Sequence, residues 1–314
     1  MNRPSINKQQ GLSLIELMVA IVISSLLMAG TIQIFVNNKQ TYRVQEAMSR
    51  LQENGRFAMQ FLTRDIRMAD FWGCVGSATK VNNTLNSGGA GFIDYASGGV
   101  SGTNDAGLNT SDTITIQGSY GNLGITVDTP YMPLVSSALH LSTPNSLQDN
   151  DIVMICDCEA CDIMQNTGNN TSTNGTLIHN VGVGVPGNAT SNLSKTYKGD
   201  ATVHLPHSIT YSIKAGASGE PALFRDIDGT DQELVEGIQN MQIKYGEDTD
   251  GDGTANRYLD ADEVIVDPLV DDMDDVVSVR ITLTATTLED NIALDGGRIE
   301  REFSSTITIR NRVN

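Results

Sequence analysis

An acidic stretch near the C-terminus carries residues whose types and spacing suit metal binding. The segment DTDGDGTANRYLD, residues 248–260, lies in a run from 247 to 275 with twelve acidic side chains and one basic side chain. Oxygen donors at loop positions 1, 3 and 5, with glycine at position 6, match the start of an EF-hand-type calcium loop. The predicted Ca²⁺ ligands are Asp248, Asp250, Asp252, the backbone carbonyl of Thr254, Asn256 and Asp260.

Two features separate this stretch from an EF-hand. Position 12 is Leu259, where an EF-hand has a bidentate acid. Asp260, one residue later, could close the shell, with Asp262 or Glu263 as substitutes. The residues before the loop, 241–245, read as a strand and not as an entering helix. We therefore expect a structural calcium loop outside an EF-hand. The alternative is a solvated acidic loop, in which the crowded carboxylates repel one another.

The four cysteines allow two kinds of chemistry. Cys74 stands alone, whereas Cys156, Cys158 and Cys161 cluster in CDCEAC. In a reducing compartment the cluster would suggest a metal or redox site. In an oxidising compartment disulfides are the expectation, and four cysteines permit three pairings.

Catalytic motifs are missing from the sequence. It contains no HExxH, P-loop or GxSxG, and the four histidines are scattered. A net charge of −18 opposes nucleic-acid binding, which requires a basic surface. The sequence gives no case for an enzyme.

The N-terminal segment indicates on which side of the membrane the rest of the chain lies. Residues 1–11 are polar and include Arg3 and Lys8, and residues 12–36 are almost entirely apolar. As a helix, residues 12–36 would extend about 37 Å, which is enough to span a bilayer. Because the positive flank precedes this helix, the N-terminus should stay cytoplasmic and the remainder should be exported.

Two ordinary readings of this segment fail. A secretory signal would have a shorter apolar stretch followed by a small-residue cleavage site, and no convincing site follows. A plain membrane anchor leaves Glu16 unexplained, since a carboxylate within a spanning helix costs about 2.5–3.5 kcal/mol.

The stretch GLSLIELMVA, residues 11–20, resembles the prepilin signature of type IV pilins and type II secretion pseudopilins. The resemblance implies that a prepilin peptidase cuts after Gly11 and that Leu12 is then N-methylated. It also implies that Glu16 pairs with the terminal amine of a neighbouring subunit. Leu12 departs from the Phe or Met that is commoner in the family at this position.

Helical periodicity continues beyond the apolar segment. The spacing predicts one helix from about residue 13 to residue 70, with Gly30 and Gly55 as places where it could bend. Arg64, Asp65 and Arg67 are expected to lie off its apolar stripe. The stripe comprises Phe57, Ala58, Phe61, Leu62, Ile66 and Ala69.

Four further segments narrow the resemblance to minor pilins of the PilW type. They are ENGRFA (53–58), RDIRMADFWGC (64–74), ELVEGIQNMQIKYG (233–246) and FSSTITIRNR (303–312). The resemblance to PilW-type proteins covers the middle of the chain only weakly. This resemblance implies a Cys74–Cys158 disulfide, with Cys156–Cys161 as a local second bridge.

The fold class expected is α+β and type IV pilin-like, with a long N-terminal helix against a mainly antiparallel β-sheet head with long loops. The regions are a leader (1–11), a transmembrane and assembly helix (12–36), its amphipathic continuation (37–74) and a β-rich head (75–314). The expected strands are 113–117, 125–127, 152–156, 176–185, 203–213, 234–245, 276–285 and 303–310.

The function expected is that of a minor pilin that primes assembly of the type IV pilus and sits at or near its tip. The alternatives are a J-like pseudopilin of type II secretion and a tip adhesin or binding module. Expected partners are other minor pilins, the major pilin, the prepilin peptidase and the inner-membrane assembly platform, with no nucleic acid. The helix would hold the chain in the inner membrane, with the head in the periplasm, until assembly.

Overall fold

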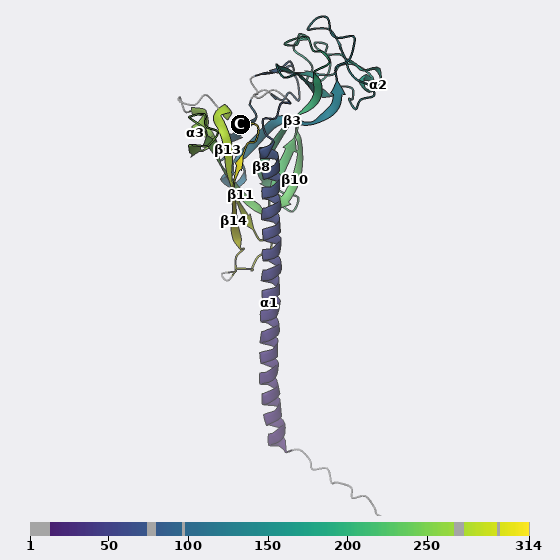
Figure 1. Ribbon diagram of the computed structural model, residues 1–314. Helices are drawn as coiled ribbons and strands as arrows, with labels where there is room; N and C mark the ends of the chain where they lie inside the picture. Colours follow the sequence, from purple (N-terminus) through teal and green to yellow (C-terminus); the bar gives the residue numbers. More distant parts are fainter. Residues whose placement is uncertain (1–12, 74–79, 96–97, 267–272, 294–295, 314) are drawn as a thin grey trace, which may run out of the picture.

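The computed structural model describes residues 13–73, 80–95, 98–266, 273–293 and 296–313. A single helix, α1 (Leu14–Arg67, 54 residues), projects from a β-rich head as a long stalk (Figure 1). About one quarter of the chain is helical and about one third is strand, mostly antiparallel, which confirms the α+β pilin-like class. Gly11, Leu12 and Cys74 lie outside the described residues.

Helix α1 begins with a capping box. Ser13 Oγ accepts a hydrogen bond from the Glu16 backbone N–H, and the Glu16 carboxylate accepts one from the Ser13 N–H at 2.9 Å. This arrangement satisfies two donors that would otherwise be unpaired at a helix start. The helix ends at the C-cap Met68, slightly earlier than the predicted residue 70.

The described residues of the head form two main sheets and one small one. The eight-stranded sheet has the order β1-β6-β5-β8-β3-β2, and β9 and β10 extend from β8. Its strands are β1 (Val81–Asn83), β2 (Val100–Thr103), β3 (Thr113–Thr126), β5 (Ile152–Cys156), β6 (Cys161–Gln165), β8 (Thr202–Ala215), β9 (Pro221–Ile227) and β10 (Thr230–Glu236). All pairings are antiparallel except that of β1 with β6.

The second sheet, of four strands, has the order β12-β11-β13-β14 and packs against α1. Its strands are β11 (Ile238–Glu247), β12 (Arg257–Leu259), β13 (Val276–Thr286) and β14 (Glu300–Thr308). In its antiparallel register Met241 lies opposite Leu283, and Leu283 lies opposite Phe303. The remaining elements are β4 (Leu139–His140), β7 (Thr176–Leu177), α2 (Thr171–Asn174), α3 (Ala261–Val266), η2 (Leu108–Thr110) and η3 (Met273–Asp275).

The head has separate apolar cores. The largest joins the C-terminal half of α1 to residues of β2, β3, β8, β9, β11, β13 and β14. A second lies among segments between residues 125 and 203, at the end of the head remote from the stalk (Figure 1). A third, smaller cluster contains Trp72 with Cys156 and Cys161. The helix therefore shares a core with only part of the head.

Four strand predictions were wrong in extent. The predicted strand 234–245 is two strands, because Gly237 adopts φ +78° between β10 and β11. Strand 176–185 is reduced to β7, which ends at Leu177, and Gly182 and Gly184 in the remainder both have positive φ. The two predicted strands 113–117 and 125–127 belong to one long, irregular strand, β3.

Candidate assembly surfaces and candidate metal loop

The N-terminal half of α1 is apolar on every side and has no cover from the head. Every residue from Leu14 to Val36 is exposed, and Phe35 is 70% exposed. By length and composition α1 can cross a membrane, with a mean hydropathy of 2.2 over its most apolar window. Exposed apolar area of this extent requires lipid or other protein around it.

Glu16 points back toward the start of this apolar helix. Its carboxylate accepts hydrogen bonds from both the backbone N–H and the hydroxyl of Ser13, at 2.9 and 3.0 Å. Ser13 directly follows Leu12, the residue predicted to carry the new amine after cleavage. The acid therefore lies within one turn of the predicted new N-terminus, where a cation from a neighbouring chain could also approach it.

The C-terminal half of α1 buries one stripe against the sheets. The buried positions recur every three or four residues, as an amphipathic helix requires. They are Ala47, Leu51, Gly55, Ala58, Leu62, Asp65 and Ile66. Of the predicted stripe, Phe57 is 40% exposed and Phe61 is half-buried, because both lie at its border.

The prediction that Asp65 lies off the apolar stripe was wrong, because Asp65 is one of the buried residues of α1. It is 2% exposed, and its carboxylate accepts a 2.6 Å hydrogen bond from the Tyr211 hydroxyl of β8. Arg225 of β9 approaches to 3.8 Å. Burial, followed by the hydrogen bond to Asp65, raises the pKa of Tyr211 above its usual range, so the hydroxyl stays a donor. Asp65 follows the buried Leu62 by three residues, and residues three apart lie on the same face of a helix. This spacing was the signal in the sequence that could have predicted its burial.

The C-terminal tail closes over the end of α1. The Arg312 guanidinium pairs with Asp70 at 2.7 Å, and both side chains are nearly buried. The Asn311 amide donates to the Ala69 carbonyl at 2.8 Å, and the Arg310 N–H donates to the Arg67 carbonyl at 3.2 Å. These bonds satisfy carbonyl groups that a helix end leaves unpaired. We call Asp70, Arg310, Asn311 and Arg312 the helix clasp.

The four PilW-like segments contact one another in pairs along the C-terminal half of α1. RDIRMADFWGC and FSSTITIRNR contact each other through the helix clasp. ENGRFA meets ELVEGIQNMQIKYG where the Asn54 amide donates to the Glu236 carbonyl at 2.9 Å. A Cβ placed on Gly55 would lie 2.2 Å from the Phe303 ring, so that ring packs directly on the helix backbone. Gly55 therefore permits close helix–sheet contact.

The acidic loop connects β11 to β12. At its base Glu247 and Arg257 are paired across the hairpin, and their side chains form a 2.6 Å ion pair. Within the loop, one carboxylate oxygen from each of Asp248, Asp250 and Asp252 lies within 4.8 Å of the others. The predicted strand before the loop is present as β11. The hairpin thus gathers the first three predicted metal ligands.

The backbone of the loop holds the Asp248 carboxylate in place. That carboxylate accepts hydrogen bonds from the N–H groups of Gly253 and Gly251, at 2.6 and 2.8 Å. Partial desolvation would raise the pKa of Asp248, but these N–H groups outweigh it and hold the pKa below the ordinary value. A carboxylate has further lone pairs, so Asp248 can accept these bonds and still bind a cation.

The other predicted ligands lie differently. The Asn256 amide is 3.4 Å from Asp250, and its oxygen accepts the Thr249 N–H at 2.7 Å. The Thr254 N–H donates to Asp252 at 2.7 Å. Asp260 instead forms an ion pair with Lys244 at 2.7 Å and is not brought into the aspartate group. Three of the six predicted ligands, Asp248, Asp250 and Asp252, therefore lie together, and Asp260 lies apart from them.

One of the two predicted disulfides is present. Cys156 and Cys161 are bonded across the β5–β6 hairpin, beside Trp72. The pairing follows from the register, because Cys156 lies directly opposite Cys161. Cys158 is exposed at the hairpin tip and forms no disulfide among the described residues. Its predicted partner, Cys74, lies outside them, so the second bridge stays a prediction.

Comparison with known proteins agrees with the geometry at both ends of the chain. Residues 6–32 match the prokaryotic N-terminal methylation motif, and residues 210–298 match the family Type IV Pilus-assembly protein W. No curated protein and no solved structure matches the chain significantly. The first match places the chain in the class of proteins with an N-terminal methylation signal and an apolar N-terminal helix.

The second match covers residues 210–298, in the C-terminal part of the head. Together with the long helix and the antiparallel head, the two matches support a type IV pilus minor pilin of the PilW type. The matches indicate a structural pilin, and the apolar helix fits anchoring in a membrane before assembly.

Proposed function

We propose that this minor pilin primes assembly of the type IV pilus and sits at or near its tip after prepilin peptidase cleaves between Gly11 and Leu12. The observation that supports this proposal is the division of α1. One half is exposed and apolar, and the other half is fixed to the head. An exposed apolar half can remain in the inner membrane and later pack against the helices of other minor pilins and the major pilin.

The first test is a count of surface pili in a strain that lacks the gene, by shearing and electron microscopy. Loss of pili, restored by the gene, is expected for a priming subunit. Normal pili would contradict priming and would favour the two alternatives, a J-like pseudopilin or a tip adhesin. A secretion assay would then separate those two.

A second test concerns Glu16. We propose that its carboxylate pairs with the terminal amine of a neighbouring subunit, because an isolated charge within lipid is costly. Glu16→Ala should still be cleaved, yet it should reduce the number of pili. Ser25→Ala is the matched control, because Ser25 is also exposed on α1 and its hydroxyl donates to the Val22 carbonyl of the same helix. Normal assembly of Glu16→Ala would remove this role.

We further propose that the β11–β12 loop binds a structural Ca²⁺ ion through Asp248, Asp250 and Asp252, with Thr254 and Asn256 completing the shell. This proposal is supported by the carboxylates of Asp248, Asp250 and Asp252, which lie close together in the β11–β12 hairpin. Such an ion would offset their mutual repulsion and brace the loop against the sheet.

Chelation tests the calcium proposal. A ligand present at about one hundred times its Kd adds about 2.7 kcal/mol to stability, so a chelator should lower the melting temperature of the head. Added Ca²⁺ should restore it. Asp250→Asn should abolish this response, and Asp262→Asn, an exposed acid on α3 outside the aspartate group, should retain it. A melt that chelation leaves unchanged would refute the site.

A further inference from the structure

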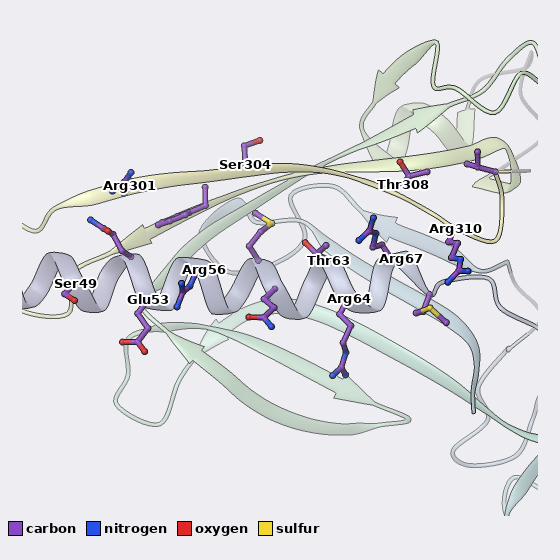
Figure 2. Close-up of a pocket in the computed structure, with 16 residues that line it drawn as sticks. Ser49, Glu53, Arg56, Thr63, Arg64, Arg67, Arg301, Ser304, Thr308 and Arg310 are labelled. Atoms are coloured by element: carbon purple, nitrogen blue, oxygen red, sulfur yellow. The ribbon is translucent and has the colours of Figure 1, made fainter. Parts of the chain in front are cut away.

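A groove of about 1520 Å³ runs between the C-terminal half of α1 and strand β14 (Figure 2). Its floor is partly apolar, with Met59 from the helix and Phe303 from the strand among the lining residues. Because the Phe303 ring packs against Gly55, the helix and strand are in direct contact at this point. The groove is therefore built on two elements that are fixed to each other.

The groove is strongly basic on an acidic protein. Arg56, Arg67, Arg301 and Arg310 all line it and are all exposed. None of these four forms a salt bridge within the described parts of the chain, although the protein has 38 acidic and 20 basic side chains. In Figure 2 the only lining acid, Glu53, points away from β14. Four arginines without acidic partners favour an anionic occupant.

The groove also opens onto an unpaired strand edge. Alternate side chains of a strand point to opposite faces, yet the lining includes Arg301 and Phe303 from one face and Ser304 and Thr308 from the other. A cavity lined from both faces must reach the edge between them. Among the described strands, β14 pairs only with β13.

One hydrogen bond shows which backbone groups of β14 face β13 and which face away from it. The Ile309 N–H donates to the Val277 carbonyl of the β13 end at 2.9 Å, so odd-numbered residues of β14 bond toward β13. Antiparallel pairing alternates, so the N–H and C=O groups of Ser304, Thr306 and Thr308 face away from β13. Groups in this arrangement are a template for one more strand.

We propose that this groove binds an extended, acidic polypeptide segment of a neighbouring subunit. The segment adds to β14 as a further strand and places its carboxylates against Arg56, Arg67, Arg301 and Arg310. The inference deepens the proposed assembly function and rests on it for the identity of the partner as a subunit. A nucleic acid is the weaker occupant, because the overall charge of −18 repels it and because it cannot use the strand edge.

The binding test uses the purified full chain in detergent micelles and a fluorescent, end-capped peptide in which glutamate and threonine alternate. Anisotropy should report saturable binding, and the matched lysine–threonine peptide should not bind. The double variant Arg56→Gln/Arg67→Gln should weaken binding about tenfold or more, since charge-assisted bonds to both arginines are lost.

A backbone variant separates strand addition from simple charge attraction. Thr306→Pro removes an N–H that faces away from β13 and should therefore leave the β13–β14 ladder intact while weakening peptide binding. Thr306→Ala keeps the N–H and should bind as the wild type does. Unchanged melting curves for both variants would show that the head remains folded.

Three outcomes would overturn the inference. The first is no binding of the acidic peptide, and the second is equal binding by the arginine variants. The third is tighter binding of a single-stranded oligothymidine that is insensitive to Thr306→Pro, which would assign the groove to nucleic acid. Peptide binding is measured on the isolated chain, whereas priming is measured by pilus counts, so the two proposals can fail separately.

Discussion

The two halves of α1 belong to one continuous helix but meet different surroundings. In the first half Leu26 is 68% exposed and Phe35 is 70% exposed, whereas Ala58 and Leu62 in the second half are fully buried. The first half is apolar all round, and the second has one apolar stripe between polar faces. A helix with a single stripe can be satisfied by its own head, whereas a helix that is apolar all round depends on surroundings outside the chain.

The strongest test of this difference between the two halves is a cavity in the buried stripe of the second half, which should have the largest effect on stability. Leu62→Ala should lower the free energy of unfolding of the head by about 2–5 kcal/mol, because it removes a fully buried side chain. Leu26→Ala is the matched change in the exposed half and should leave that free energy unchanged. Urea unfolding of the full chain in detergent measures both. Equal effects would mean that both halves share the head's core.

The next effect concerns the buried acid on the same stripe. Tyr211→Phe removes the hydroxyl that donates to Asp65 and should cost about 1.5–3 kcal/mol of unfolding free energy. Tyr42→Phe removes an exposed hydroxyl from the stalk side of α1 and should cost nothing measurable. The same urea titration distinguishes them. A neutral Tyr211→Phe would show that Asp65 is satisfied without this bond.

A smaller effect follows from adding volume where α1 touches β14. Gly55→Val would drive a side chain into the Phe303 ring and should destabilise the head by about 1–3 kcal/mol. Gly30→Val has open space around it and should leave the melting temperature of the head unchanged. Thermal unfolding by circular dichroism measures both. A stabilised Gly55→Val head would mean that Phe303 moves aside freely.

The smallest effect lies outside α1 and is a pH dependence. Burial lowers the pKa of His179 below 6.5, so the folded state keeps the ring neutral while the unfolded chain takes up a proton. Because the unfolded state then binds more protons, stability should fall as the pH drops from about 7.5 to about 5.5. His179→Gln, which can still bond to the Ser137 carbonyl, should flatten this slope.

The same pH dependence also tests whether the buried half of α1 is coupled to His179. The loss caused by Leu62→Ala should be the same at both pH values, since no titration is involved. A loss that varied with pH would link the helix core to His179. Melting temperatures of the single and double variants at the two pH values would reveal such coupling.

Much of α1 and of the metal loop was predictable because the signals are local. The 3.6-residue period predicted the helix, and the expected strands 203–213, 276–285 and 303–310 match β8, β13 and β14 to within a few residues. The spacing of Asp248, Asp250 and Asp252 predicted that their carboxylates would converge. Short, weakly patterned strands such as β1, β6 and β9 were missed, because pairing with distant partners creates them.

The sequence by itself determined the apolar helix with its acid, the methylation motif, and the strand–loop–strand character of the aspartate loop. Each depends on residues within about one or two helical turns or one hairpin of each other. Only the tertiary structure decided that Asp65 is buried beneath Tyr211, that Asp260 pairs with Lys244, and that the tail clasps the end of α1. These contacts join residues far apart in the chain, and their partners are selected by packing, which no local pattern encodes.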